Sequence, residues 1–301
     1  MLIGKTLLEE EKVINLICDI RKRKTLEDLN EDFVREQLFQ YLNKNHKLAA
    51  NLNGNFHTKS AIYKKVMKEV REQLRRVYGL YRIDVEKEYR KKLVNELIEG
   101  KDLVTNVKKI LETHSSTKER LTFYSKLYDK IFKITGKPKS IIDLGCGVNP
   151  FSIPFMDLNK TNKSAKITKL NYYAYDISEE EIQALNEFFA YLSKQNKYFW
   201  GHAKVLDIFT LAEIEHHDNI DICFLLKMTD VLDRGKGHKV SEEVITKVPA
   251  KYVVVSFSTK TMSGKEMNFP ERKWIELMCE RLKYKIEKFR FSNEIFYVIK
   301  K

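Results

Sequence analysis

The sequence predicts an α/β protein in two parts: an all-helical domain over residues 1–112 and a doubly wound sheet domain of seven strands over 113–301. Three observations lead to this fold class. The first part has no proline and carries apolar residues at helical spacing. Strand-like and helix-like segments alternate from residue 140 onward. Finally, Ile141–Pro150 reads IIDLGCGVNP, an apolar strand that runs into an acid and a Gly-x-Gly turn.

Apolar residues of the first part recur every three to four positions, which is the spacing of a helix stripe that faces a core. Two such groups are Leu7, Leu8, Ile14, Leu16 and Ile17, and then Phe33, Val34, Leu38, Tyr41 and Leu42. Asn51–Asn55 reads NLNGN, a turn-rich break that we interpret as the boundary between two small helical pieces.

Ser60–Tyr78 is the clearest predicted helix, with one apolar face and one basic face. The apolar face carries Tyr63, Val66, Met67, Val70, Leu74 and Val77, and the basic stripe carries Lys64, Lys68, Arg71 and Arg75. The chain has a net charge of +13, and residues 59–92 alone hold 12 Lys and Arg against 5 Asp and Glu. This clustering favours a nucleic-acid partner, because each neutralised phosphate releases counterions, although a solvated face would show the same spacing.

Seven segments of the second part are predicted strands. They are 140–144, 172–175, 203–206, 220–225, 252–257, 285–291 and 295–299, and a hairpin turn at Ser292 and Asn293 joins the last two. A parallel sheet that closes with an antiparallel hairpin resembles the Rossmann-like sheet of class I S-adenosylmethionine-dependent methyltransferases. It differs from the sheet that binds dinucleotides.

The turn after the first of these strands indicates a nucleoside pocket, because glycines let a ligand approach the backbone closely. The turn lacks the third glycine of a dinucleotide fingerprint and the Gly-Lys-Ser/Thr of a phosphate loop. Its form, D-x-G-x-G from Asp143 to Gly147, resembles motif I of S-adenosylmethionine-dependent methyltransferases. The alternative is a helix-capping turn of an unrelated α/β protein.

Three acids end successive predicted strands: Asp143, Asp176 and Asp207. The carboxyl ends of parallel strands meet at the edge of the sheet where ligands bind. Asp176 is placed to accept hydrogen bonds from ribose hydroxyls, and Asp207 from an adenine amino group. Each acid alone would more commonly cap the next helix, but the ordered set after this turn indicates a cofactor pocket.

The segment HSSTKERL, His114–Leu121, precedes the turn. Its Ser115 to Thr117 with Glu119 reads as a helix N-cap. Together with DLGCGVNP it closely resembles the aminoglycoside-resistance 16S rRNA guanine-N7 methyltransferases of the Arm/Rmt group. Further similar segments are LRRVYGLY (74–81), FLLKMTDVL (224–232), VSFSTKTMSGKE (255–266) and NEIFYVIKK (293–301), so that the resemblance covers about residues 56–301.

The resemblance implies a residue set for the cofactor S-adenosyl-L-methionine. His114, Ser115, Ser116 and Arg120 would contact its methionine end, with Arg120 paired to the carboxylate. Asp143, Gly145 and Gly147 would form the turn beside it, Asp176 would hold the ribose, and Asp207 with Ile208 the adenine. RNA contacts are expected from the basic stripe and from Lys265, or alternatively from a face around Lys260, Lys265 and Arg272.

The implied reaction is methylation of 16S rRNA at guanine N7 in the decoding region of the 30S subunit, with aminoglycoside resistance as a consequence. Guanine N7 carries a free lone pair, so that no general base is expected and positioning does the catalysis. The target base must be unstacked, and it could stack on Trp274 or Phe269.

The chain departs from the family pattern near the substrate side. Residues 267–274 read MNFPERKW, Asp230 replaces a proline, and the loop between Phe151 and Tyr172 is longer. The exact nucleotide therefore stays open. Alternatives are a methyltransferase of another rRNA or tRNA site, and an RNA-binding ribosome-assembly factor with a methyltransferase fold.

Composition limits the setting of the protein. The four cysteines form no C-x-x-C pair, so no zinc site or disulfide framework is expected. Acidic residues stand where a signal peptide would be basic, and no apolar run has the length of a membrane span. We expect a cytoplasmic monomer without a metal ion.

Overall fold

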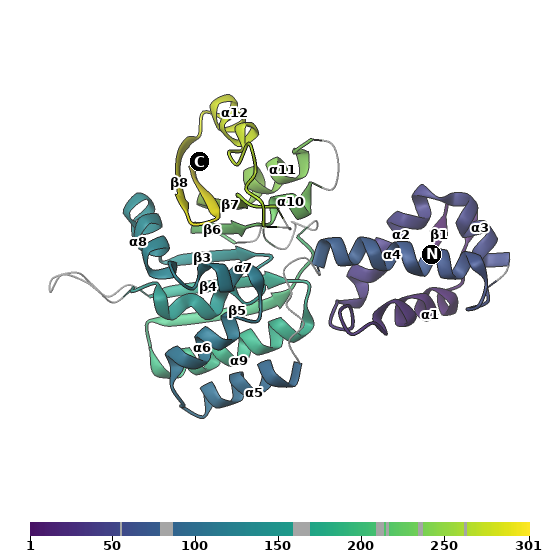
Figure 1. The fold of residues 1–301 in the computed structure, drawn as a ribbon, viewed down its shortest axis with the longest axis horizontal. Helices are drawn as coiled ribbons and strands as arrows, with labels where there is room; N and C mark the ends of the chain where they lie inside the picture. The colour runs from purple at the N-terminus through teal and green to yellow at the C-terminus, as the bar shows by residue number, and fades with distance from the viewer. Residues whose placement is uncertain are drawn as a thin grey trace. The chain divides into compact units, whose positions relative to one another are not determined.

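A computed structural model describes residues 1–54, 56–78, 87–158, 169–208, 214, 217–233, 237–261 and 264–301. Contacts divide the chain into two compact units (Figure 1). The N-terminal unit comprises Met1–Asp84 and Ile177–Glu179, and the sheet unit comprises Val85–Asp176 and Glu180–Lys301. Ile177–Glu179 count with the first unit because Leu29 pairs with Ser178 in an isolated bridge and the Asn30 amide donates to the Ile177 carbonyl at 3.1 Å.

The N-terminal unit is helical apart from one small antiparallel ribbon. Its elements are β1 (Leu2–Ile3), β2 (Thr6–Leu7), α1 (Glu10–Arg21), α2 (Glu31–Lys44), α3 (His46–Gly54) and α4 (Ala61–Tyr78). Side-chain caps begin two of the helices: Asn30 Oδ1 accepts from the Phe33 amide, and Ser60 Oγ accepts from the Tyr63 amide.

One hydrophobic core joins all four helices of this unit. Leu16, Leu38 and Leu52 meet Val66 and Val70 of α4 in it. The interpretation of Asn51–Asn55 as a boundary between two helical pieces was therefore wrong. Helix α3 runs on through Gly54, and the segment that follows is a connection inside one domain, because the helices on both sides bury their apolar faces together. Asn55 itself lies outside the described residues.

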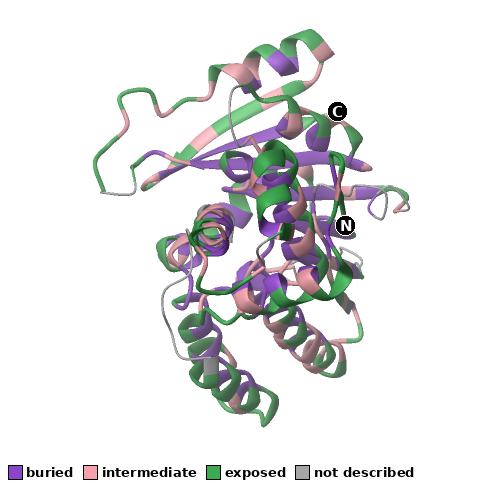
Figure 2. Ribbon diagram, turned by 90° about the vertical axis from the view of Figure 1, so that its right-hand side faces the viewer, coloured by how far each residue is buried: buried purple, intermediate pink, exposed green. Residues whose placement is uncertain are grey.

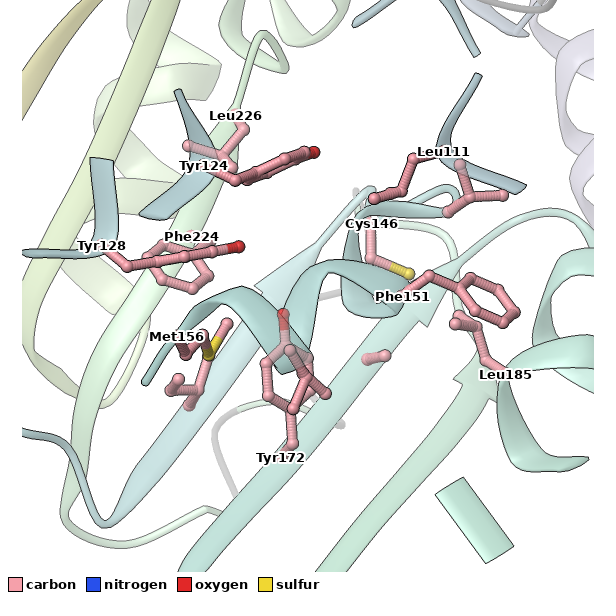
Figure 3. Packing of buried hydrophobic residues seen from close by; sticks show 14 of the residues in the cluster. Leu111, Tyr124, Tyr128, Cys146, Phe151, Met156, Tyr172, Leu185, Phe224 and Leu226 are labelled. Carbon is pink, nitrogen blue, oxygen red and sulfur yellow. The ribbon is translucent and has the colours of Figure 1, made fainter. Parts of the chain in front are cut away.

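Helices α5 (Lys87–Ile98) and α6 (Leu103–Leu111) count with the sheet unit. The contacts therefore do not divide the chain at the expected boundary after residue 112. Leu97 and Leu111 lie in the same cluster as Phe151 and Leu185, and Figure 3 shows Leu111 beside this part of the core. Helical periodicity alone could not predict that α5 and α6 pack with the sheet unit, because a helix uses the same apolar stripe to pack on another helix or on a sheet.

The sheet unit contains the seven strands that the sequence predicts. They are β3 (Ser140–Leu144), β4 (Leu170–Asp176), β5 (Phe199–Val205), β6 (Ile220–Leu226), β7 (Ala250–Ser258), β8 (Lys285–Phe291) and β9 (Glu294–Lys300). Their order is β5-β4-β3-β6-β7-β9-β8. The first five are parallel, and β9 runs antiparallel to both of its neighbours, which confirms the hairpin at Ser292 and Asn293.

Helices cover both faces of this sheet, and alternate strand residues face opposite layers. Ile141 and Phe224 pack on one side with α5, α6, α8 (Tyr124–Thr135), η1 (Asn149–Phe155) and α9 (Glu179–Gln195). Ile142 and Cys223 pack on the other with α10 (Thr229–Leu232), α11 (Lys239–Lys247) and α12 (Lys273–Leu282). The central strands are buried on both faces, and the outer helix surfaces are exposed (Figure 2). Within the described ranges, no helix combines the length and apolarity that a membrane span needs.

Gly201 of β5 provides a test of this packing. A Cβ atom added there would lie 2.6 Å from Cγ of the buried Phe189 ring. We expect Gly201→Ala to lower the free energy of unfolding by about 1–3 kcal/mol, because a rigid ring cannot yield cheaply in a close-packed core. Gly54→Ala is the control, since nothing lies within 4 Å of its added Cβ. Equal denaturant midpoints for both variants would contradict this packing.

Candidate cofactor-binding site

The glycine turn after β3 has the backbone geometry that only glycine adopts readily. Gly145 has φ +64° and Gly147 has φ +47°, both in the left-handed region. The Cys146 amide donates to the Tyr175 carbonyl at 3.0 Å, and the Gly147 amide donates to Asp176 Oδ2 at 2.8 Å. The turn is thus fixed to the carboxyl end of β4, where Asp176 is the last residue of the strand.

Both glycines also leave room for a neighbouring side chain. A Cβ on Gly145 would lie 2.3 Å from Sδ and Cε of Met228, and one on Gly147 would lie 3.2 Å from Nδ1 of His114. Met228 lies two residues after β6, and His114 precedes α7 (Ser115–Arg120). Residues from three separate parts of the chain therefore meet at this turn.

A carboxylate contacts the His114 ring at Nε2, the nitrogen that does not face the glycine turn. Its Nε2 lies 2.7 Å from Oε1 of Glu181, and both residues are buried, at 6% and 1% exposure. The expected N-cap at Ser115 to Thr117 was wrong: α7 begins at Ser115, His114 occupies the cap position, and no side chain caps it. Thr117 instead donates from Oγ1 to the Leu111 carbonyl, and Ser115 and Ser116 are half-buried.

Asp176 and Asp207 lie at the same edge of the sheet, because Asp176 ends β4 and Asp207 follows the neighbouring parallel strand β5. The Leu206 amide donates to the Asp176 carbonyl at 2.9 Å and fixes the start of the segment that carries Asp207. Asp207 is half-buried, and Ile208 beside it is buried in the core on one face of the sheet. A half-buried acid beside an apolar side chain suits an aromatic ring with a polar edge.

Asp143 has a different environment from the other two acids. It is 1% exposed, and its Oδ2 accepts from Nδ2 of Asn149 and from the hydroxyl of Tyr172, each at 2.8 Å. Burial raises the pKa of Asp143 to about 6, although both hydrogen bonds and the charge of Arg120 act in the other direction. The carboxyl supports the turn from inside the protein.

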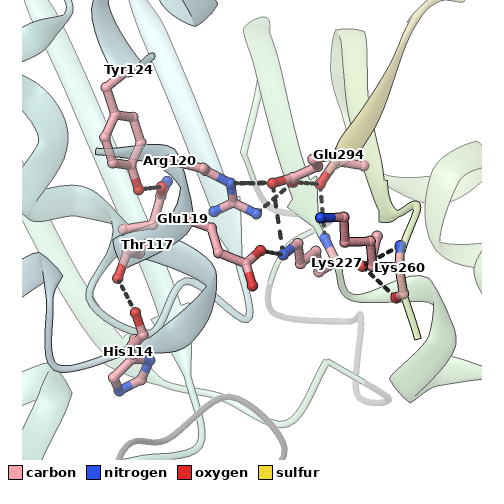
Figure 4. A network of polar contacts seen from close by, with 11 residues as sticks. His114, Thr117, Glu119, Arg120, Tyr124, Lys227, Lys260 and Glu294 are labelled. Atoms are coloured by element: carbon pink, nitrogen blue, oxygen red, sulfur yellow. Dashed lines mark hydrogen bonds and ion pairs between the residues drawn. The ribbon is translucent and has the colours of Figure 1, made fainter. Parts of the chain in front are cut away.

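Arg120 is fully engaged with a residue that sequence reasoning missed. Its Nε lies 3.0 Å from Oε2 of Glu294, and its Nη2 lies 2.7 Å from Oε1 (Figure 4). The two residues are 1% and 0% exposed. Burial is the largest single influence and would lower the pKa of Arg120, but the interactions with Glu294 and Tyr124 together outweigh it and raise that pKa. Glu294 is visible in the sequence as the acid in NEIFYVIKK, but nothing local marks it as the partner of Arg120.

Lys227 joins the same buried cluster from the end of β6. Its Nζ lies 2.6 Å from Oε2 of Glu119 and 3.8 Å from Oε2 of Glu294. It has φ +58° and its amide donates to Oγ of Ser256 at 3.0 Å, so this buried lysine holds a backbone geometry that is uncommon outside glycine. The lysine that ends the apolar run in FLLKMTDVL was the available sequence signal.

The basic stripe of α4 lines a cleft in the N-terminal unit. The cleft has a volume of about 720 Å³, and its basic residues are Arg23, Lys64, Lys68, Arg71 and Arg75. Lys64, Lys68 and Arg75 are exposed, whereas Arg71 is half-buried and donates from Nη2 to the Asp19 carbonyl at 2.5 Å. Arg23 comes from the loop after α1, and sequence reasoning missed it because no periodicity connects it to α4.

The other residues expected to contact RNA or the target base follow β7 in the chain. Lys265 is exposed, and Phe269 is 86% exposed. Trp274 is partly buried against the core, and its ring stacks on His238 with centroids 4.3 Å apart. Phe269 is therefore accessible to a base, whereas the Trp274 ring already has a stacking partner. Within the described residues, no group of three His, Cys, Asp or Glu could hold a metal ion.

Known proteins resemble this chain in sequence over most of its length. The family model "Ribosomal RNA methyltransferase (FmrO)" matches residues 58–298. The chain is 27% identical over 255 residues to the 16S rRNA (guanine(1405)-N(7))-methyltransferase of Proteus mirabilis, covering 78% of this chain and 84% of that protein. It is 28% identical over 202 residues to the enzyme of the same name from Micromonospora echinospora, covering 65% and 66%.

Solved structures share the fold. The 16S rRNA methyltransferase RmtF in complex with S-adenosyl-L-homocysteine aligns with a TM-score of 0.72 at 20% identity, over 98% of this chain and all of that one. The 16S rRNA methylase RmtB aligns with a TM-score of 0.66 at 22% identity, over 96% and 98%. These two structures confirm the class I methyltransferase sheet and the presence of a helical N-terminal part.

The pKa of Asp143 predicts a specific pH dependence of stability. The pKa of this carboxyl is near 3.8 in the unfolded chain and about 6 in the folded protein, so the folded protein binds the proton more tightly. Protonated Asp143 therefore stabilises the fold, and this contribution is lost as the pH rises from about 4 to about 6. Relative to Asp143→Asn, the unaltered protein should gain on the order of 2–3 kcal/mol of unfolding free energy as the pH falls through this window. Denaturant titrations at several pH values measure it. Asp129→Asn, at an exposed site, is the control, and its difference in unfolding free energy from the unaltered protein should not change with pH. The same lack of pH dependence for Asp143→Asn would refute the assignment.

The paired geometry of Arg120 makes lysine a poor replacement. We expect Arg120→Lys to cost about 2 kcal/mol of stability, because lysine cannot donate two parallel N–H groups to Glu294. Glu294→Gln should cost more, about 3–5 kcal/mol, since it leaves a buried charge without its counter-ion. Thermal unfolding of both variants measures the order, and an Arg120→Lys protein as stable as the unaltered one would contradict the pairing.

Proposed function

Because the chain belongs to the FmrO family of ribosomal RNA methyltransferases, we propose that it transfers a methyl group from S-adenosyl-L-methionine to N7 of one guanine in 16S rRNA. The target nucleotide we propose is the one in the names of its relatives, guanine 1405. Modification of this decoding-region base in the 30S subunit would make the ribosome resistant to aminoglycosides. The substrate sets the compartment, so we place the protein in the cytoplasm, where it acts as a monomer.

The observation that carries this proposal is the glycine turn with its bound partners. The Gly147 amide donates to Asp176, the His114 ring lies against Gly147, and Asp207 lies at the same edge of the sheet. A Cβ on Gly145 would meet the side chain of Met228, and one on Gly147 would meet that of His114, so the backbone of the turn approaches both residues closely. This set suits an adenosine with an amino-acid tail: the carboxylates would accept from its hydroxyl and amino groups, and the buried ring of His114 would lie near the methionine end.

Residue roles follow from these positions. Asp176 would accept from the ribose hydroxyls, and Asp207 with Ile208 would receive the adenine. His114, Ser115 and Ser116 would face the methionine end. The contact implied between Arg120 and the cofactor carboxylate stays a prediction: Nε and Nη2 already donate to Glu294, so that a second carboxylate would have to share the guanidinium.

The chemistry asks little of the protein beyond positioning. The bound cofactor supplies an electrophilic methyl group on a sulfonium. Guanine N7 has an in-plane lone pair and no proton to remove, so the chain need only align the two reactants and exclude water. Buried pairs such as Arg120 with Glu294 serve this purpose, because they fix the ends of β9 and α7 in one geometry.

RNA docking is proposed for the basic cleft of the N-terminal unit. Exposed Lys64, Lys68 and Arg75 can each neutralise a phosphate, and Arg23 adds a further charge to the cleft from the loop after α1. Such contacts read the shape and backbone of a folded RNA more than its sequence. Lys265 and the exposed Phe269 would meet the RNA nearer the target base.

The direct test is chemical. N7-methylguanosine is cleaved after borohydride and aniline treatment, and primer extension on 16S rRNA from cells with and without the protein locates the break. One new stop at guanine 1405 is expected. A stop elsewhere, or cleavage in tRNA, would indicate another target. Cofactor binding without any cleavage would favour the ribosome-assembly factor.

The basic cleft gives a separate prediction. Replacing Lys64, Lys68 and Arg75 together by Gln should abolish methylation of 30S subunits and leave cofactor affinity unchanged. The slope of log affinity against log salt should become shallower by about 0.7–0.9 per lost phosphate contact, up to about 3 in all. Filter binding at several salt concentrations measures the slope.

A matched control removes the same charge elsewhere. Lys194, Lys197 and Lys285 are exposed lysines of the sheet unit, and their triple Gln variant should keep the original salt slope. If both triple variants lose binding equally, the effect is one of net charge and the cleft has no special role.

A further inference from the structure

His114 belongs to a buried cluster of charged residues whose other members had no predicted role. Glu181 is the third residue of α9 and is 1% exposed. Its Oε1 lies 2.7 Å from Nε2 of His114 and 3.5 Å from Nη1 of Arg90. Arg90, on α5, is 5% exposed, and its Nε donates to Oγ1 of Thr113 at 3.3 Å. Three elements thus meet at one carboxylate.

The cluster fixes the chemistry of the His114 ring. An ionised carboxylate can only accept, so Nε2 carries the hydrogen of this bond. Nδ1 then points to the glycine turn, 3.2 Å from the position that a Cβ on Gly147 would take. Oε2 of Glu181 lies 3.9 Å from that same position, so the carboxylate itself supports the ring beside the turn.

Packing alone does not require this arrangement. A buried ion pair is often no more stable than apolar side chains of the same volume, because desolvation cancels much of the attraction. What it provides is a unique orientation of the ring. Nη1 of Arg90 lies 3.5 Å from the same carboxylate oxygen and so supports the carboxylate that contacts His114, which gives α5 a place beside the cofactor site.

We propose that Glu181 is a positioning residue for cofactor binding. It holds His114 with Nε2 protonated and Nδ1 presented as a hydrogen-bond acceptor to the α-ammonium group of the methionine end, and Arg90 supports it. This inference rests on the proposed cofactor site but not on the identity of the RNA target.

Two ligands separate positioning from general structural support. S-adenosyl-L-homocysteine carries the amino-acid end, whereas 5′-methylthioadenosine has the same nucleoside without it. By calorimetry, Glu181→Leu should weaken the first ligand about tenfold or more, the loss of one charge-assisted hydrogen bond, and leave the second unchanged. Glu181→Gln should retain most of the affinity, because its amide oxygen still accepts from Nε2.

A variant of the ring itself keeps the test decisive if Glu181→Leu does not fold. The His114→Gln side chain can still donate to Glu181 but has no counterpart of Nδ1. It should fold normally and show the same selective loss of S-adenosyl-L-homocysteine. In combination with Glu181→Leu it should show no further loss.

The inference is overturned if both ligands weaken equally in these variants, which would indicate a structural cluster, or if neither weakens. Since no RNA enters the measurement, failure of rRNA methylation would count against the proposed function and leave this result standing.

Discussion

The hydrogen bond from the Gly147 amide to the Asp176 carboxylate is the constraint on which the candidate site depends. It joins the end of β3 to the end of β4 and requires a left-handed backbone at the turn. With the turn fixed, His114 can lie against Gly147 and Met228 against Gly145. Groups from β4, from the segment after β6 and from the segment before α7 therefore meet at this edge of the sheet.

Two buried charged clusters stiffen the surroundings of that turn. One joins Arg120, Glu294 and Lys227, and the other joins His114, Glu181 and Arg90. Buried charges contribute little net stability, yet they tolerate few alternative geometries, because every unpaired state leaves a charge without solvent. A reaction that needs only alignment of a methyl group and a lone pair benefits from such rigidity.

The N-terminal unit illustrates a different use of charge. Its cationic cleft is open to solvent, and its apolar residues form a core of their own. Exposed cations are weakly bound to their own protein and are available to phosphates. Even there one carboxylate stays charged: hydrogen bonds from Lys22 and then from Tyr63 lower the pKa of Asp19, which tempers the positive field of the cleft wall.

Local pattern determined much of this protein. Periodicity and turn-forming residues predict the seven strands, the closing hairpin, the glycine turn and the amphipathic helix α4. These signals depend only on residues a few positions apart in the chain. The tertiary structure alone decided that α5 and α6 serve the sheet unit, that Asp143 faces inward, and that Arg120 pairs with Glu294, 174 positions away. A buried charge takes whichever partner the fold brings within reach, and no local sequence signal names that partner.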